Sequence, residues 1–379
     1  MNRREFNRNV LAVTGATAAL LAGGATGVGG AAGAAGAAGV SDAWPGNGAE
    51  SDDAFGPKGL TDVDGLKVGH FTDQRRPTGC TVVLCEKGAV AGVDVRGGAP
   101  GTRETDLLNP VNIVQQIYGL VLSGGSSFGL DSASGVMRYL DENKIGYPMG
   151  GEIRVPIVPA AIIYDLEVGD WKIRPDAEAG YKASQGASSE KVEEGNVGAG
   201  AGATIGKLFG AKWAMKGGLG TASLRIGKTG VVVAALVAVN AVGDVYDRHT
   251  GSILAGARAE DGKGYRNTIA RIREGYAVMA QPGRNTTVGV VATNAKLSKD
   301  QATKVAQMAH DGYARAINPV HTPYDGDTIF ALATGTFSGT VETLAMGALA
   351  AEAVSEAIVR AIGQAKGIPG YPSVRDFRA

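Results

Sequence analysis

Residues 283–298 read GRNTTVGVVATNAKLS, and this stretch carries the strongest indication of both fold and chemistry. The polar segment QPGRN at 281–285 leads directly into an apolar run at 287–293. A short apolar run that is rich in β-branched residues and bounded by turn residues is typical of a buried strand. The sequence therefore predicts a buried strand with Thr286 at its mouth, next to a flexible polar segment.

Thr286 at the mouth of a strand makes one particular reaction possible. Its hydroxyl can attack the carbonyl carbon of Asn285 and move the acyl group from nitrogen to oxygen, and hydrolysis of the ester then frees Thr286 as a new chain terminus. The freed α-amine has an unperturbed pKa of roughly 7.7–8.0, so one residue can supply both nucleophile and general base. From spacing alone the stronger interpretation is an ordinary turn, because Asn-Thr-Thr before a strand is common.

Other apolar runs indicate what surrounds this strand. Runs typical of strands occur at 81–85, 90–95, 119–122, 155–164, 231–239 and 328–334, and helical periodicity occurs at 130–140, 298–317 and 341–362. The run VVVAALVAV at 231–239 is apolar on both faces, so it must be covered on both sides. Ser298 and Gln301 have the spacing of a capping box. These features predict a layered α/β protein with sheets inside and helices outside, although not its strand order.

Glycine is unusually abundant, with 59 residues, and it clusters in three places. GAGAGATIGKL at 198–208 is not a P-loop, because Ala201 and Leu208 stand where that motif needs Gly and Ser or Thr. LSGGSSFG at 122–129 lacks the G-x-G-x-x-G spacing of a dinucleotide site, and KGGLGTAS at 216–223 has no defensible context for phosphate binding. The sequence contains neither G-x-S-x-G nor H-E-x-x-H. We therefore interpret all three clusters as backbone that must pack closely.

Composition narrows the class of protein further. The chain has 379 residues, 44% of them hydrophobic, which can support a sizeable core. Lys plus Arg and Asp plus Glu both number 37, so no basic excess is present to follow a nucleic-acid backbone. Cys80 and Cys85 are five apart in a predicted strand, which places them on opposite faces and makes a disulfide unfavourable. The four histidines lack zinc-site spacing. We predict no metal, no organic cofactor and no nucleic-acid partner.

The N-terminal residues resemble a targeting signal rather than part of the fold. Arg3 and Arg4 precede an apolar stretch and then a Gly/Ala tract, which is the order of a signal peptide, and the paired arginines resemble the twin-arginine export signal. The apolar stretch is too short and too interrupted by glycine for a stable membrane span. An ordinary secretory signal or an uncleaved anchor is the alternative. We assign 1–43 to the signal and tract and 44–58 to a linker, and expect a periplasmic or secreted protein.

Several stretches together resemble the L-aminopeptidase/D-esterase family, which includes β-peptidyl aminopeptidases and a pantetheine hydrolase. They are TDVDGLKVGHFTD (61–73), GGAPGTRETDLL (97–108), LSGGSSFGLDSASGVMRYL (122–140), GAGAGATIGK (198–207), KGGLGTAS (216–223), AALVAVNAVGD (234–244) and NTTVGVVATNAKLS (285–298). The resemblance implies a four-layer αββα sandwich, with two central sheets flanked by helices, as one catalytic domain at 59–379. It also implies self-cleavage into an α chain that ends at 285 and a β chain 286–379, and oligomers of such pairs.

The same resemblance implies roles for individual residues. Thr286 corresponds to the nucleophile, and Asn240 to an oxyanion-stabilising amide. Asp325 and Asp327 stand where the family has a Ser-Gly-Glu sequence, and they can orient the amines of Thr286 and the substrate. Their alternative role is to cap a turn. Tyr164 falls near a second active-site hydroxyl, in a loosely aligned region.

Three functions remain open on the sequence. The first is an amide hydrolase that releases N-terminal amino acids from small peptides or amides through an acyl-enzyme, with a pantetheine-like amidase as a variant in the same fold. The second is an acyltransferase of the ornithine acetyltransferase type, which also uses a threonine freed by self-cleavage. The third is an exported binding protein that never cleaves. The Asn285-Thr286 pair resembles the pantetheine-hydrolase variant.

Overall fold

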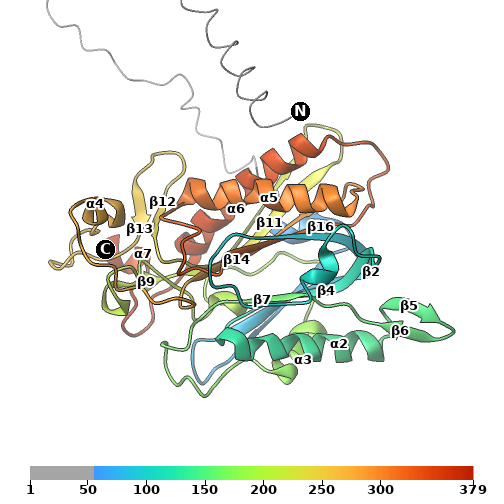
Figure 1. The fold of residues 1–379 in the computed structure, drawn as a ribbon, viewed down its shortest axis with the longest axis horizontal. Coiled ribbons are helices and arrows are strands. Elements are labelled where there is room, and N and C mark those ends of the chain that lie inside the picture. The colour runs from blue at the N-terminus through green and yellow to red at the C-terminus, as the bar shows by residue number, and fades with distance from the viewer. Residues whose placement is uncertain (1–54, 379) are drawn as a thin grey trace, which may run out of the picture. The chain divides into compact units, whose positions relative to one another are not determined.

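The computed structural model describes residues 55–378 (Figure 1). The predicted export signal and most of the predicted linker lie outside the described residues. The last linker residues belong to the folded domain, because the N–H of Gly56 donates to the carbonyl of Ser223 at 2.9 Å and Phe55 packs against the core. Within 55–378, no helix combines the length and apolar character needed to cross a bilayer.

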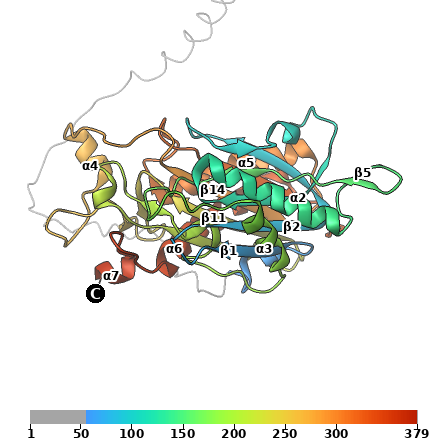
Figure 2. The same cartoon turned by 90° about the horizontal axis from the view of Figure 1, so that it is seen from below.

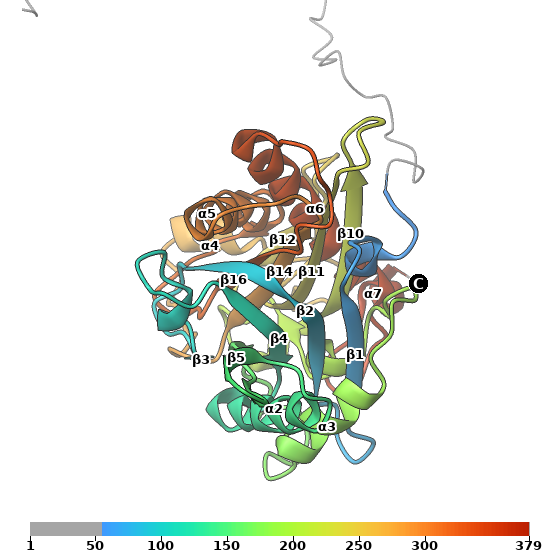
Figure 3. The ribbon, with the colours of Figure 1, turned by 90° about the vertical axis from the view of Figure 1, so that its right-hand side faces the viewer.

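The domain has four layers, which confirms the αββα expectation (Figure 3). The first layer contains helices α5 (Lys299–Ala316) and α6 (Thr343–Gln364). The second contains strands β10 (Gly218–Arg225), β11 (Val232–Asn240), β14 (Thr286–Thr293) and β16 (Thr328–Ala333). The third contains β1 (Lys67–Thr72), β3 (Thr102–Arg103), β4 (Gln116–Ser123) and β7 (Ala160–Ile162). Helices α2 (Ser132–Glu142) and α3 (Ala177–Gln185) form the fourth.

One long strand, β2 (Gly79–Val95), joins the two sheet layers. Its first half pairs with β1 and β4, and its second half pairs with β16. The register shifts between Leu84 and Ala89, so the strand is irregular where the two halves meet. Hydrogen bonding therefore runs continuously through nine strands, so the two predicted sheets are two parts of one folded-over sheet. The strands predicted at 81–85 and 90–95 are both parts of β2.

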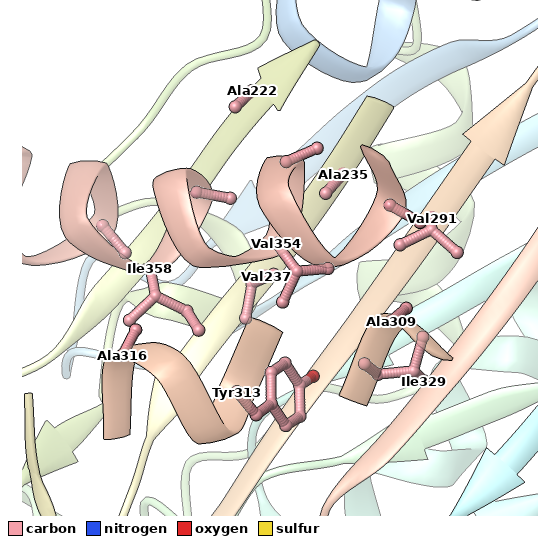
Figure 4. Packing of buried hydrophobic residues seen from close by; sticks show 14 of the residues in the cluster. Ala222, Ala235, Val237, Val291, Ala309, Tyr313, Ala316, Ile329, Val354 and Ile358 are labelled. Atoms are coloured by element: carbon pink, nitrogen blue, oxygen red, sulfur yellow. The ribbon is translucent and has the colours of Figure 1, made fainter. Parts of the chain in front are cut away.

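Alternation along β11 explains how a strand can be apolar on both faces. Val233, Ala235 and Val237 face α5 and α6, where they pack with residues such as Val354 and Ile358 (Figure 4). Ala234, Leu236 and Ala238 face the space between the two sheet layers. The two cysteines divide in the same way, since Cys80 faces α2 and α3, Cys85 faces the space between the sheets, and both are free thiols.

The glycine cluster at 216–223 allows close packing, as predicted. A Cβ at Gly220 would lie 2.1 Å from the carbonyl oxygen of Ala357, so α6 approaches β10 more closely than any other residue type permits. The segment forms strand β10, which the sequence analysis did not assign, because glycine has a low strand propensity. The capping box at the start of α5 is present as predicted, with both Ser298 and Gln301 making their bonds.

The strand predicted at 155–164 is divided. Pro156 and Pro159 interrupt it, since proline cannot donate a ladder hydrogen bond. The structure instead has β6 (Ile153–Val155), which pairs with β5 (Tyr147–Gly150) in a hairpin that extends away from the sheets (Figure 2), and then β7. The remaining elements are short: β8 (Thr204–Ile205), β9 (Met215–Lys216), β12 (Asp244–Tyr246), β13 (Ile253–Ala255), β15 (Ile317–Asn318), α4 (Thr268–Arg273), α7 (Val374–Arg378) and the 3-10 turns η2 (Gly59–Asp62), η3 (Asp106–Leu108), η4 (Ser126–Asp131), η5 (Gly198–Gly200) and η6 (Ala211–Trp213).

Candidate active site

Thr286 is the first residue of β14, and the strand order places other predicted site residues around it. Antiparallel pairing of β11 with β14 sets Asn240 directly opposite Thr286. Parallel pairing of β14 with β16 sets Val288 beside Thr328, so the loop that precedes β16 runs alongside Thr286. That loop carries Asp325 and Asp327. Four predicted site residues thus meet at one end of the second layer, which contains β11, β14 and β16, and all four are at most 1% exposed.

The hydroxyl of Thr286 is directed at the peptide bond that precedes it. Thr286 Oγ1 donates to the carbonyl oxygen of Asn285 at 2.5 Å. The same carbonyl oxygen accepts the main-chain N–H of Gly326 at 2.9 Å. A donor fixed on this oxygen can stabilise the negative charge that attack on the carbonyl would create there. A Cβ at position 326 would lie 2.7 Å from Thr286 Oγ1, so only glycine fits beside the hydroxyl.

Asp327 anchors the start of β14. Its Oδ1 accepts the main-chain N–H of Thr287 at 2.8 Å, which fixes the residue that follows the predicted nucleophile. Its Oδ2 lies 3.0 Å from both the main-chain nitrogen and the ring Nδ1 of His321. The contacts place Asp327 in a positioning role and show that it does more than close the turn before β16.

Asp325 is a carboxylate whose pKa is raised by its surroundings. Its Oδ2 accepts the main-chain N–H and the hydroxyl of Thr322, at 2.9 Å and 2.5 Å. Burial, with a further contribution from the charge of Asp327, raises the pKa of Asp325 to about 6. A carboxyl group with that pKa can exchange a proton at nearly neutral pH. The capping interpretation also holds for Asp325, because both Thr322 bonds lie within the loop.

Asn240 is fully buried, and both ends of its side chain are engaged. Its Oδ1 accepts from the N–H of Thr204 at 3.0 Å and from Lys207 Nζ at 2.9 Å. Its Nδ2 donates to the main-chain carbonyl of Tyr164 at 3.1 Å. In the intact chain the main-chain donor on the Asn285 carbonyl is Gly326, while the Asn240 amide is bonded to Tyr164. Tyr164 reaches Asn240 through its main chain, so its position at the site does not depend on the predicted phenol.

Lys207 is a site residue that the sequence analysis missed. Its Nζ donates to the carbonyl and Oδ1 of Asn240, at 3.1 Å and 2.9 Å, and to the carbonyl of Arg284 at 3.0 Å. Burial lowers its pKa to about 7, against the opposing effect of the Asp325 charge. A signal was present, since a lysine inside the apolar run TIGKLF at 204–209 must either reach solvent or find buried partners.

The residues before Thr286 differ from the strand that follows. Residues 272–279 are exposed on the surface, and burial begins only at Asn285. Within the described residues, neither polar atom of the buried Asn285 side chain has a hydrogen-bond partner, which disfavours this arrangement. A cavity of about 50 Å³ adjoins Asn285, Lys207 and Arg284, and it is large enough to admit water.

The described residues contain no side-chain arrangement typical of a metal site. Among residues 55–378, no three His, Cys, Asp or Glu side chains are arranged to hold a metal ion. Around Thr286, the side chains of Asn240, Asp325 and Asp327 are bonded to other polar groups and to the main chain. The chemistry that these residues themselves offer is nucleophilic attack by a hydroxyl, with a lysine and a carboxyl group that titrate near neutrality.

Comparison with known proteins identifies the class to which this site belongs. The sequence profile of peptidase family S58 matches residues 58–375, so the chain belongs to that family and is a hydrolase of peptide or amide bonds. An uncharacterized aminopeptidase from Mycobacterium leprae is 42% identical over 83% of this chain and 92% of its own. A 6-aminohexanoate-oligomer endohydrolase from Kocuria sp. is 31% identical over 79% of this chain and 84% of its own.

Solved structures show the same fold at lower identity. A β-aminopeptidase from Burkholderia sp. aligns with a TM-score of 0.60 and 22% identity, covering 83% of this chain and 88% of that one. The L-aminopeptidase D-Ala-esterase/amidase from Ochrobactrum anthropi aligns with a TM-score of 0.63 and 20% identity, covering 86% of this chain and 93% of that one. The latter is described as a variant of the Ntn hydrolase fold, in agreement with the four layers found here.

Proposed function

We propose that this protein cleaves itself between Asn285 and Thr286 and then hydrolyses amides with Thr286 as an N-terminal nucleophile. The observation that carries the proposal is the 2.5 Å contact between Thr286 Oγ1 and the carbonyl oxygen of Asn285. It is supported by the Gly326 N–H on the same oxygen at 2.9 Å. Nucleophile, scissile carbonyl and oxyanion donor are thus assembled within one chain.

Self-cleavage proceeds in two steps. Thr286 Oγ1 attacks the carbonyl carbon of Asn285, the hydroxyl proton passes to a base, and the Gly326 N–H stabilises the oxyanion. The C–N bond breaks, the nitrogen of Thr286 takes up a proton, and an ester remains between Asn285 and Thr286 Oγ1. Water then hydrolyses the ester and leaves a carboxylate on Asn285 and a free amine on Thr286. Asp325 and Lys207 are the neighbouring groups with pKa values near neutrality, about 6 and about 7, that suit proton transfer.

Turnover repeats this chemistry on an external amide. The Thr286 hydroxyl attacks the substrate carbonyl while the α-amine of the same residue accepts its proton. The amine product leaves, and water hydrolyses the acyl-enzyme. Asn240, which lies opposite Thr286 in the register, and Lys207, which is bonded to Asn240, hold the polar surroundings of the new terminus in place.

The substrate class is a small peptide or a linear amide. One group of relatives carries the name aminopeptidase, and another is named for hydrolysis of 6-aminohexanoate oligomers. Both names describe hydrolysis of amide bonds between amino-acid units. Export by the twin-arginine route and assembly into oligomers of αβ pairs remain part of the proposal, supported by the residue order of 1–43 and by the resemblance described above.

The test follows the acyl-enzyme rather than product alone. Purified, cleaved protein is incubated with aminoacyl p-nitroanilides, β-peptides and 6-aminohexanoate oligomers, and samples are quenched in acid for mass spectrometry. We expect amine release together with a transient acyl adduct on the fragment that begins at Thr286. Thr286→Ala is expected to show neither. Equal hydrolysis by Thr286→Ala, or turnover by the cleaved protein with the adduct on another residue, would overturn the proposal.

A further inference from the structure

The segment that ends at Asn285 is, under the proposed function, the first substrate that this site meets. Whatever holds this segment occupies the place of the acyl side of later substrates. Its contacts therefore identify groups that can bind the corresponding part of an external amide. Several contacts hold its main chain, among them those from Met279 N–H to the carbonyl of Leu208 at 2.9 Å and from Gly283 N–H to the carbonyl of Tyr324 at 3.3 Å.

The side chain next to the scissile residue is held by charge. The guanidinium of Arg284 forms an ion pair with the carboxylate of Glu167 and lies 5.7 Å from the ring centroid of Tyr164. The carbonyl of the same residue accepts from Lys207 Nζ at 3.0 Å. The side chains of Arg284 and Glu167 are 39% and 34% exposed, so the pair lies at the rim of the site and is accessible from solvent.

A carboxylate combined with an aromatic face is a pair of groups that recognises cations. Glu167 and Tyr164 lie on the same loop, which follows β7, and the main-chain carbonyl of Tyr164 is bonded to Asn240. One short loop therefore carries both cation-binding groups, and its hydrogen bond to Asn240 attaches it to the strand end that faces Thr286. Arg284 belongs to the exposed side of the scissile bond, which self-cleavage detaches from Thr286.

We propose that Glu167, with the ring of Tyr164, forms a subsite for a positively charged group on the acyl part of the substrate. The inference rests on the proposed function and adds a substrate class to it. After cleavage Arg284 is no longer joined to Thr286, so a cation on the substrate can compete with its guanidinium for the subsite. A substrate cation that fits the subsite lies where the guanidinium of Arg284 lies, at the end of a long side chain on the residue before the attacked carbonyl. The preferred acyl group therefore carries a distal ammonium or guanidinium, in addition to or instead of an α-amine on the attacked residue.

The chain itself supplies the best probes. Two p-nitroanilides are compared, Arg-Asn p-nitroanilide and citrulline-Asn p-nitroanilide, because citrulline is the uncharged counterpart of arginine and the two differ in one charge. Binding of the pentapeptide QPGRN and of its citrulline analogue to the same cleaved protein is measured by calorimetry. The calorimetric arm does not depend on hydrolysis, so failure of this inference and failure of the proposed function can be told apart.

The expected result is a charge preference that depends on Glu167. The arginine compounds should bind roughly three- to tenfold more tightly than the citrulline compounds, with the difference in KM rather than kcat, as suits a partly exposed ion pair. Glu167→Gln should remove the preference, and Glu167→Arg should reverse it toward a Glu-Asn analogue. The matched control is Glu178→Gln on α3, which breaks a surface ion pair with Arg138 on α2 and should leave the preference intact.

All variants are assayed as protein that mass spectrometry shows to be cleaved. If Glu167→Gln does not cleave, Arg284→Gln provides the second test: it keeps the subsite but removes the chain's own cation, so the KM for the arginine substrate should fall. Equal affinity of wild type for the arginine and citrulline peptides, or a preference unchanged in Glu167→Gln, would overturn the inference. Charge-dependent peptide binding without any hydrolysis would instead overturn the proposed function alone.

Discussion

The two sides of the Asn285–Thr286 bond have opposite physical characters. On the C-terminal side, all eight residues of β14 are buried, and the strand pairs with β11 along its length and with β16 from Val288 onward. On the N-terminal side, residues 272–279 are exposed, and a few polar contacts fasten the segment to the body of the domain.

This difference assigns a task to each side. A nucleophile must stay fixed to within a fraction of an ångström, and the buried strand achieves this for Thr286. The segment before it has to approach the nucleophile once and then leave, and weak attachment at the surface suits that purpose.

The largest effect is expected from the nucleophile. Thr286→Ala should abolish self-cleavage and amide hydrolysis while the domain still folds, because a buried alanine satisfies the strand but offers no hydroxyl. Gel analysis after prolonged incubation should show one chain. Thr286→Ser is the matched control, since it restores a hydroxyl and should restore cleavage.

Gly326→Ala should slow self-cleavage by about 100-fold, because its Cβ would press on Thr286 Oγ1 and displace it from the scissile carbonyl. The rate is followed by the appearance of the two fragments from a freshly made precursor. Gly363→Ala is the control, as a Cβ there meets no atom within 4 Å. Equal rates for both variants would mean that the close approach to the hydroxyl is not required.

The pH dependence of self-cleavage should reflect the two groups that burial brings toward neutrality. Burial raises the pKa of Asp325 to about 6 and lowers that of Lys207 to about 7, so the ionised carboxylate and the neutral amine both accumulate as pH rises. The rate should therefore increase through this window and then level off. Asp325→Asn should remove the lower part of the rise, and Lys207→Arg, which stays charged, should remove the upper part. A flat profile in wild type would contradict these roles.

The smallest effect is expected on the exposed side of the bond. Met279→Ala removes a side chain that is 65% exposed and should change the free energy of unfolding by less than about 0.5 kcal/mol. Phe330→Ala, on the neighbouring strand β16, removes a fully buried ring and should cost about 3–5 kcal/mol. Urea denaturation in the Thr286→Ala background keeps both sides in one chain. Comparable losses would show that the exposed segment is part of the rigid fold.

Local sequence signals were sufficient to predict much of the frame. The buried strand at Thr286, the doubly apolar strand at 231–239 and the capping box of α5 all depend on residues close together in the chain, and all are present. The division at Pro156 and Pro159 was equally local and was overlooked. Strand β10 was missed because its glycines serve contact with α6, which only the tertiary fold reveals.

The site was less predictable because it depends on strand register. Asn240 meets Thr286 only through the pairing of β11 with β14, and resemblance rather than spacing suggested the two residues together. Gly326 acts through its main-chain N–H, which no residue pattern specifies. Lys207 is bonded to Asn240 and to the carbonyl of Arg284, contacts between segments far apart in the sequence.

The most direct test of self-cleavage is intact-mass spectrometry of the purified protein with N-terminal sequencing. We expect two chains that copurify, one of them a 94-residue fragment that begins TTVGVV. A single uncut chain, stable over days under conditions that support hydrolysis, would contradict the assignment of Thr286 as the liberated nucleophile.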